Sequence, residues 1–238
     1  MKLLFYLNLV FFALFNQTDY YREAKRLFDN KQYNESIQIC SKQLTTLGSK
    51  DTLYKKFLHL RIDSYIELKY FDLGIKDYLK LTEIEPNELT NYVGLSYLYG
   101  ETNDFSDCII VLEKALEINP IDVYTFNNLS YYSSQMGNYA SAVKYAQDGL
   151  KIVIDPVWKA ALLNNEGYGL IGLKKYSEAL ININESIKLN PDNSFAYCFR
   201  AIANANLKNF ETVCSDLYKA KNLGAENLTK DLIKQYCK

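Results

Sequence analysis

The chain has 238 residues and only four prolines, which recur at an almost constant interval. Each proline closes a short phrase of one aliphatic residue, one polar residue and the proline itself. The phrases are Ile84-Glu85-Pro86, Ile118-Asn119-Pro120, Ile154-Asp155-Pro156 and Leu189-Asn190-Pro191, so the prolines lie 34, 36 and 35 residues apart. A helix breaker that recurs at a fixed period indicates an array of structural repeats, which grows by stacking and needs no single core.

A second pattern with the same period is an aromatic residue followed three residues later by a mostly small one. Residues three apart lie on one face of a helix, where a small side chain lets a neighbouring helix approach closely. The aromatic residues are Tyr33, Phe71, Phe105, Tyr139, Tyr176 and Phe210, and their followers are Ser36, Gly74, Cys108, Ala142, Ala179 and Val213. Further small residues precede them at Ala24, Ser96, Ser130, Gly167 and Ala201, with polar breaks such as Met136-Gly137-Asn138 between the two sets. Each unit is therefore predicted to be a helix, a tight turn and a second helix.

These marks together resemble the tetratricopeptide repeat. The best match runs from Asn128-Leu129-Ser130 through Gly137-Asn138-Tyr139-Ala140-Ser141-Ala142 to Gly149-Leu150. The resemblance implies an all-α fold, a right-handed superhelical solenoid of about six helix-turn-helix units. We expect the units at about 17–50, 55–88, 89–122, 123–158, 160–193 and 194–224, followed by a C-terminal capping helix over 225–238.

The N-terminus has a different composition. Lys2 precedes thirteen almost wholly apolar residues, the pattern of a secretory signal peptide, which we expect over residues 1–16. This run is shorter than the roughly 20 residues of a membrane span, so no stable span is expected. The chain is therefore expected to be exported, to the periplasm or beyond. The alternative is a cytoplasmic or membrane-associated protein whose apolar N-terminus packs on the first repeat, since no good cleavage motif follows the run.

Five cysteines are present. Cys214 and Cys237 lie at nearly equal helical distances from Gly224, which ends a helix, so two antiparallel helices would bring their sulfurs to one level. The stretch from Cys214 to Ala220, with Leu223-Gly224 and Tyr236-Cys237, also resembles the end of secreted repeat proteins of Bacteroidetes-type bacteria, which implies a closed C-terminal cap. Two unpaired thiols are the alternative. Cys108 is expected in the core, and Cys40 and Cys198 are expected to be half exposed.

The sequence favours no catalytic or cofactor chemistry. No Cys-x-x-Cys motif is present and His59 is the single histidine, so neither a metal nor another cofactor is expected. Nucleophile and phosphate-loop motifs are missing, which predicts a protein that is not an enzyme. The formal net charge of −1 gives no support to nucleic-acid binding. A protein or peptide partner is the remaining class, and the oligomeric state stays open.

The first helices of such repeats line the concave face, which is the ligand surface that the resemblance implies. The predicted groove residues are Tyr97, Asn127, Asn128, Tyr131, Gln135, Asn164, Asn165 and Tyr168. Two consecutive units carry the same Asn-Asn-x-x-Tyr phrase, and Asn amides suit a peptide backbone while Tyr adds contact area. Composition alone is the competing explanation, because Asn and Tyr are abundant throughout. Chaperone-binding relatives use a Lys that is absent from the corresponding positions here, which argues against capture of a chaperone tail.

Overall fold

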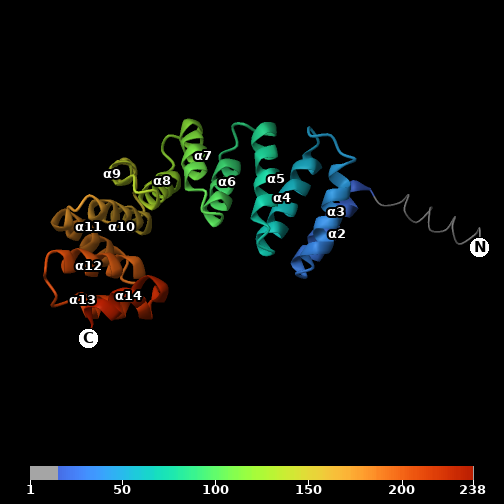
Figure 1. Ribbon diagram of the computed structural model, residues 1–238. Helices are drawn as coiled ribbons and strands as arrows, with labels where there is room; N and C mark the ends of the chain where they lie inside the picture. Colours follow the sequence, from blue (N-terminus) through green and yellow to red (C-terminus); the bar gives the residue numbers. More distant parts are fainter. Residues whose placement is uncertain (1–15, 238) are drawn as a thin grey trace, which may run out of the picture. The chain divides into compact units, whose positions relative to one another are not determined.

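A computed structural model describes residues 16–237, which form α-helices and no strands. The all-α prediction is thus confirmed for this part of the chain. The helices divide into two compact units, the first ending at Asn103 and the second beginning at Asp104. Figure 1 shows both units, each made of consecutive helices joined by short turns. The predicted signal peptide falls almost wholly on residues 1–15, outside the described part.

Within residues 16–103 the first unit contains five helices. They are α2 (Gln17–Asp29), α3 (Tyr33–Leu44), α4 (Thr52–Glu67), α5 (Phe71–Ile84) and α6 (Leu89–Glu101). Each packs on the next, and α2 also packs on α4. Asn16 caps α2, because its side chain accepts from the Asp19 N–H while the Asp19 carboxylate accepts from the Asn16 N–H. Asn16 therefore belongs to the first repeat, one residue before the expected boundary.

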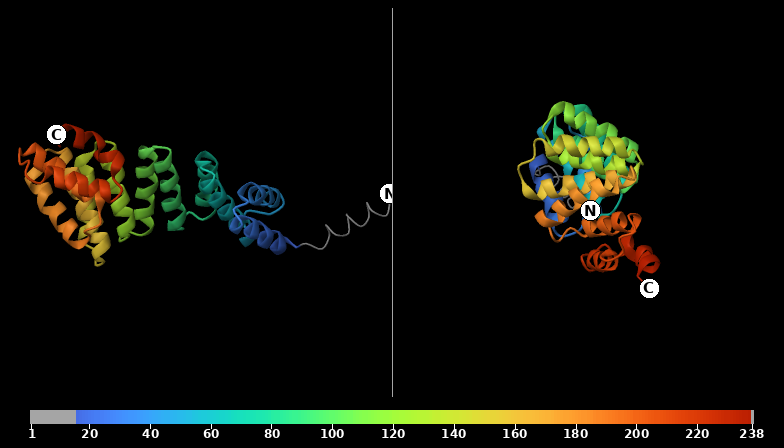
Figure 2. Two further views of the ribbon diagram at one scale, coloured as in Figure 1. Left: turned by 90° about the horizontal axis from the view of Figure 1, so that it is seen from below. Right: turned by 90° about the vertical axis from the view of Figure 1, so that its left-hand side faces the viewer.

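In residues 104–237 the second unit contains eight helices. They are α7 (Phe105–Ile118), α8 (Val123–Gln135), α9 (Tyr139–Leu150), α10 (Pro156–Gly172), α11 (Tyr176–Leu189), α12 (Ser194–Asn206), α13 (Val213–Asn222) and α14 (Glu226–Tyr236). Neighbours in sequence pack on each other, and α10 also contacts α8 on one side and α12 on the other. The first helices of three successive repeats thus form one row, α8–α10–α12 (Figures 1 and 2).

The predicted small positions lie at the helix contacts, as expected. All of them are buried, and none that carries a side chain is more than 1% exposed. Ser130 on α8 donates its hydroxyl hydrogen to the Ala142 carbonyl of α9 at 2.8 Å. At Gly167 on α10 even a methyl group lacks room, since its carbon would lie 2.5 Å from Ile183 Cγ1 on α11. Small side chains therefore set how closely the helices of a pair approach.

The turn inside every repeat uses one residue in the left-handed backbone region. These residues are Lys31, Lys69, Asn103, Gly137, Lys174 and Lys208, with φ between 59° and 77°. The next N–H then reaches back to close the helix end, as Lys175 N does to Leu170 O at 2.8 Å. Only Gly137 adopts this conformation without the cost that a side chain brings.

Two units begin before the residues at which the sequence predicts them to begin. Pro156 was expected in a turn between units, but it is the first residue of α10, where its missing N–H costs nothing. The Asp155 carboxylate accepts from the Val157 and Trp158 N–H groups and caps the helix there. In the same way α4 begins at Thr52, before the expected residue 55, because Asp51 caps it.

Two repeats contain the same ion pair between a partly buried arginine and a buried aspartate. Arg200 on α12 binds the Asp216 carboxylate of α13 with two hydrogen bonds, at 2.8 and 2.6 Å, and donates a third at 3.0 Å to Asn184 Oδ1 on α11. In the first unit Arg61 on α4 does the same with Asp77 on α5 and donates a third hydrogen bond to Ser41 on α3. Each arginine links three helices, and since its donors are occupied within the fold we assign it a structural role.

The C-terminal helix α14 covers the apolar face of the last repeat. Leu232, Ile233 and Tyr236 pack against a cluster on α12 and α13 that includes Val213 and Leu217. A disulfide joins Cys214 to Cys237, with the two Cα atoms 5.5 Å apart, so the structure closes the expected cap covalently.

The other three cysteines are buried thiols. The expectation that Cys40 and Cys198 are half exposed is wrong, because both face neighbouring helices and are 0% exposed. Burial raises the pKa of Cys40, Cys108 and Cys198 to about 12. These thiols therefore stay protonated and unreactive near neutral pH.

Candidate functional site

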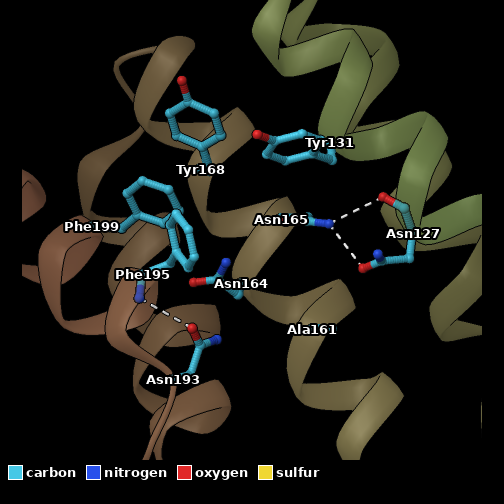
Figure 3. Close-up of a pocket in the computed structure, with 9 residues that line it drawn as sticks. All are labelled: Asn127, Tyr131, Ala161, Asn164, Asn165, Tyr168, Asn193, Phe195 and Phe199. Carbon is cyan, nitrogen blue, oxygen red and sulfur yellow. Dashed lines mark hydrogen bonds between the residues drawn. The ribbon is translucent and has the colours of Figure 1, made fainter. Parts of the chain in front are cut away.

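The second unit contains a cavity of about 220 Å³ between α8, α10 and α12. We call it the α10 cavity, since that helix forms its floor. Its walls are Asn127, Tyr131, Ala161, Asn164, Asn165, Tyr168, Asn193, Phe195 and Phe199. Figure 3 shows the amides and rings of these residues facing one another across the space between the helices.

Five predicted groove residues meet in this cavity. They are Asn127 and Tyr131 from α8 with Asn164, Asn165 and Tyr168 from α10. The repeated Asn-Asn-x-x-Tyr phrase brings them together because equivalent residues of successive first helices lie side by side in the row.

The other predicted residues lie outside the cavity wall. Asn128 accepts a hydrogen bond from Asn127 Nδ2 at 3.3 Å, and Gln135 is exposed near the end of α8. Tyr97 is on α6 in the first unit and is 43% exposed.

Two of the amides hold helices together. Asn165 Nδ2 donates to Asn127 Oδ1 at 2.9 Å and to the Asn127 carbonyl oxygen at 3.1 Å (Figure 3). The bonds run from α10 to α8 and link two successive repeats. Asn165 therefore fixes the width of the cavity at this point and has no amide hydrogen to spare for a ligand.

Among the residues of the cavity wall, Asn164 has a buried polar atom without a hydrogen-bond partner. It is 6% exposed, it lines the cavity, and its Oδ1 atom has no hydrogen-bond partner. A buried acceptor without a donor costs about 1–3 kcal/mol.

Aromatic rings form the opposite wall. Tyr168 and Phe199 stack with their centroids 4.5 Å apart and an interplanar angle of 4°. Phe195 and Tyr131 stand at the rim, 50% and 40% exposed. Burial raises the pKa of both Tyr131 and Tyr168, so their hydroxyls keep the proton at neutral pH. The wall thus offers flat apolar surface with hydroxyl groups at its edge.

The residues that α12 contributes were missed from the sequence. Phe199 occupies the repeat position of Asn128 and Asn165, and Phe195 that of Ala161, but the sixth unit does not carry the Asn-Asn-x-x-Tyr phrase. Asn193 was also missed; it caps α12 by accepting from the Phe195 N–H at 3.1 Å and so fixes where the ring stands. Alignment by repeat position, in place of a search for one phrase, would have found both rings.

The cavity wall carries no charged side chain. Glu166, the neighbour of Asn165, is 8% exposed and accepts from Gln147 on α9 at 2.8 Å. Within residues 16–237 no group of acidic, Cys or His side chains is arranged to hold a metal ion. No helix of this range has the length and apolar character needed to cross a bilayer.

Comparison with known proteins gives one family match and many similar folds. Residues 89–122, which contain α6 and α7, match the family model of the tetratricopeptide repeat. The human Cell division cycle protein 16 homolog is 29% identical over 140 residues, which are 56% of this chain and 22% of that protein. The chain thus spans about a fifth of the length of this curated relative.

Two solved structures show the same fold at low identity. The C-terminal part of a repeat protein from Cytophaga hutchinsonii aligns with a TM-score of 0.63 at 18% identity, over 91% of this chain and 87% of that one. YrrB, a repeat protein with an unusual peptide-binding site, aligns with a TM-score of 0.59 at 18% identity, over 82% of this chain and 97% of YrrB. The predicted all-α helical-repeat solenoid is therefore confirmed, and residues 89–122 of the chain match the tetratricopeptide repeat.

Proposed function

We propose that the chain is a non-catalytic scaffold that binds a peptide segment of a protein partner in the α10 cavity. Proteins of this family mediate protein–protein interactions. The observation that carries the proposal is the composition of the cavity wall, which combines amides and aromatic rings without a charged side chain. Amides can pair with a peptide backbone, and rigid rings give contact area at small cost in conformational entropy.

A terminal carboxylate is a poor candidate ligand for this cavity. Capture of a carboxylate needs a cationic side chain or a set of free N–H donors. The wall has neither Lys nor Arg, and both amide hydrogens of Asn165 are already donated to Asn127. An internal segment of the partner fits this chemistry better than a chain end does.

The test replaces two exposed rings at the rim. Tyr131→Ser with Phe195→Ser removes contact area that is already 40% and 50% exposed, so the cost in stability should be small. Tyr218→Ser on α13, where the ring is 47% exposed, is the matched control. Partners retained by the immobilised parent and identified by mass spectrometry should be lost with the double variant and kept with the control. Equal retention by the double variant would place the ligand on another surface.

We also propose that the protein is exported. The apolar segment near Lys2 and the disulfide between Cys214 and Cys237 support this, because structural disulfides persist in oxidising compartments. The alternative is an intracellular adaptor, similar to a co-chaperone, that keeps its apolar N-terminus. N-terminal sequencing of protein isolated from cell fractions separates the two. A mature chain in the cytoplasm that still begins at Met1 contradicts export.

A further inference from the structure

The α10 cavity has features that specify which side chain of a partner peptide it can bind, an inference that rests on the function proposed above. We propose that it receives one aromatic side chain that carries a hydrogen-bonding group, a tyrosine or a tryptophan, from an uncharged internal segment of the partner. Four observations lead to this ligand: the unpaired amide, the stacked rings, the volume and the missing charge.

The unpaired amide calls for a polar group on the ligand. Asn164 Oδ1 has no partner, and the residue is 94% buried on the cavity wall, with 6% of its surface exposed. The last torsion of an Asn side chain is broad and nearly two-fold, so the amide can exchange the positions of Oδ1 and Nδ2 and turn its oxygen to the cavity without strain in α10. A donor on the ligand would then satisfy it. A tyrosine hydroxyl and an indole N–H are both donors, whereas a phenylalanine ring has none.

The stacked rings call for a flat ligand. Tyr168 and Phe199 already stack in parallel, and Phe195 stands beside Phe199 with ring centroids 6.3 Å apart. A ring that enters the cavity can contact the exposed face of Phe195 without displacing this stack. Aromatic pairs of this kind contribute about 0.5–1.5 kcal/mol beyond the area they bury.

The volume and the charge set the remaining limits. An apolar cavity of about 150 Å³ holds benzene, so 220 Å³ leaves room for a phenol or an indole ring. A carboxylate or ammonium group would lose its hydration here and find no opposite charge on the wall, which is costly. The ligand ring therefore comes from a segment without charged neighbours.

The experiment uses short synthetic peptides with both ends blocked and a single central residue among uncharged flanks. The central residue is Tyr, Trp, Phe or Asp, and one further Tyr peptide has a free carboxylate. Binding to the full chain is measured by isothermal titration calorimetry. We expect the Tyr and Trp peptides to bind about tenfold more tightly than the Phe peptide, since a change of this size lies within the cost of leaving a buried hydrogen bond unmade. The Asp peptide should not bind.

The variant Asn164→Leu separates this inference from a loss of folding. It removes an unpaired polar group and keeps a similar volume, so the melting temperature should not fall. The preference for Tyr over Phe should then disappear while the Phe peptide binds at least as well as before. Asn182→Leu, the same substitution on α11 outside the cavity wall, should keep the preference.

Where the peptides bind, any of three results would overturn the inference. They are equal binding of the Tyr and Phe peptides to the parent, a need for the free carboxylate, and an unchanged preference in Asn164→Leu. If partner capture still depends on Tyr131 and Phe195 while the peptides show no preference, the proposed function stands and the aromatic ligand is wrong. Absence of binding by every peptide also refutes the aromatic ligand, whereas partner capture tests the function separately.

Discussion

The approach of α10 to α11 makes Gly167 a strong test of the packing described above. Substitution by Ala adds one carbon, which would lie 2.5 Å from Ile183 Cγ1 and 3.1 Å from Ile183 Cδ1. Ile183 is 0% exposed, so its side chain has nowhere to move. Ala is a better helix former than Gly by about 1 kcal/mol. Overpacking a close-packed contact costs about 1–3 kcal/mol, and a contact this short belongs at the upper end.

The gain in helix propensity and the cost of overpacking together lower the free energy of unfolding by about 2 kcal/mol. For a chain of this size this corresponds to a fall of roughly 4–8 °C in melting temperature. Repeat arrays do not always unfold in one step. Hydrogen exchange followed by mass spectrometry should therefore accompany the thermal melt, with the loss of protection centred on α10 and α11.

Two controls make the result specific. Gly48→Ala is the same substitution where no atom lies within 4 Å of the new carbon, and it should leave stability unchanged or slightly raised. In an Ile183→Ala background the new methyl group has room, so Gly167→Ala should there cost nothing. A Gly167→Ala variant that melts at or above the parent temperature refutes the close approach of the two helices.

The remaining predictions concern the cap, the thiols, a turn and an ion pair. A non-reduced digest should contain the Cys214 and Cys237 peptides linked, and Cys237→Ser should lower stability by about 3 kcal/mol; unlinked peptides would contradict the closed cap. The three buried thiols should resist a thiol reagent until the protein unfolds. Since their pKa is raised to about 12, they favour folding fully below about pH 8.5, and this contribution should fall as the pH rises to 12; rapid native labelling would refute it. Lys174→Gly should raise the melting temperature, because glycine adopts the left-handed backbone conformation of this residue without the cost of about 1 kcal/mol that a side chain brings. A lower melting temperature would show that contacts of the lysine side chain contribute more than this cost. Asp216→Ala leaves Arg200 uncompensated, so unfolding in urea should show a loss of about 3 kcal/mol, and an unchanged midpoint would make the pair dispensable.

The helix pairs could be predicted because their contacts repeat. Small residues recur wherever two helices meet, and that requirement is the same in every unit. The greater length of α10 can also be recognised in the sequence. Ser130 and Gly167 are 37 residues apart, against 34 between Ser96 and Ser130, and α10 has 17 residues where α8 has 13. The prolines gave the wrong boundary there because a proline suits the first position of a helix as well as a turn.

The site was harder to predict, since it depends on distances between helices. The sequence placed Asn164 and Asn165 together as ligand groups, yet one is tied to α8 and the other is left unpaired. Which of two adjacent amides reaches the next repeat depends on how far apart α8 and α10 lie. The rings of α12 could not be found from a repeated phrase, because Phe199 stands at the repeat position that Asn occupies in the two preceding units.

The hydrogen bonds from Asn165 to Asn127 couple ligand binding in the cavity to the stability of the two repeats that they join. They join two repeats at the cavity, so the cavity exists only while both repeats are folded. Ligand binding and the folding of these repeats are therefore thermodynamically linked, and each increment of binding free energy also resists their separation. A partner held there would act as a clamp on the α8–α10 junction and shift the first step of unfolding to other repeats.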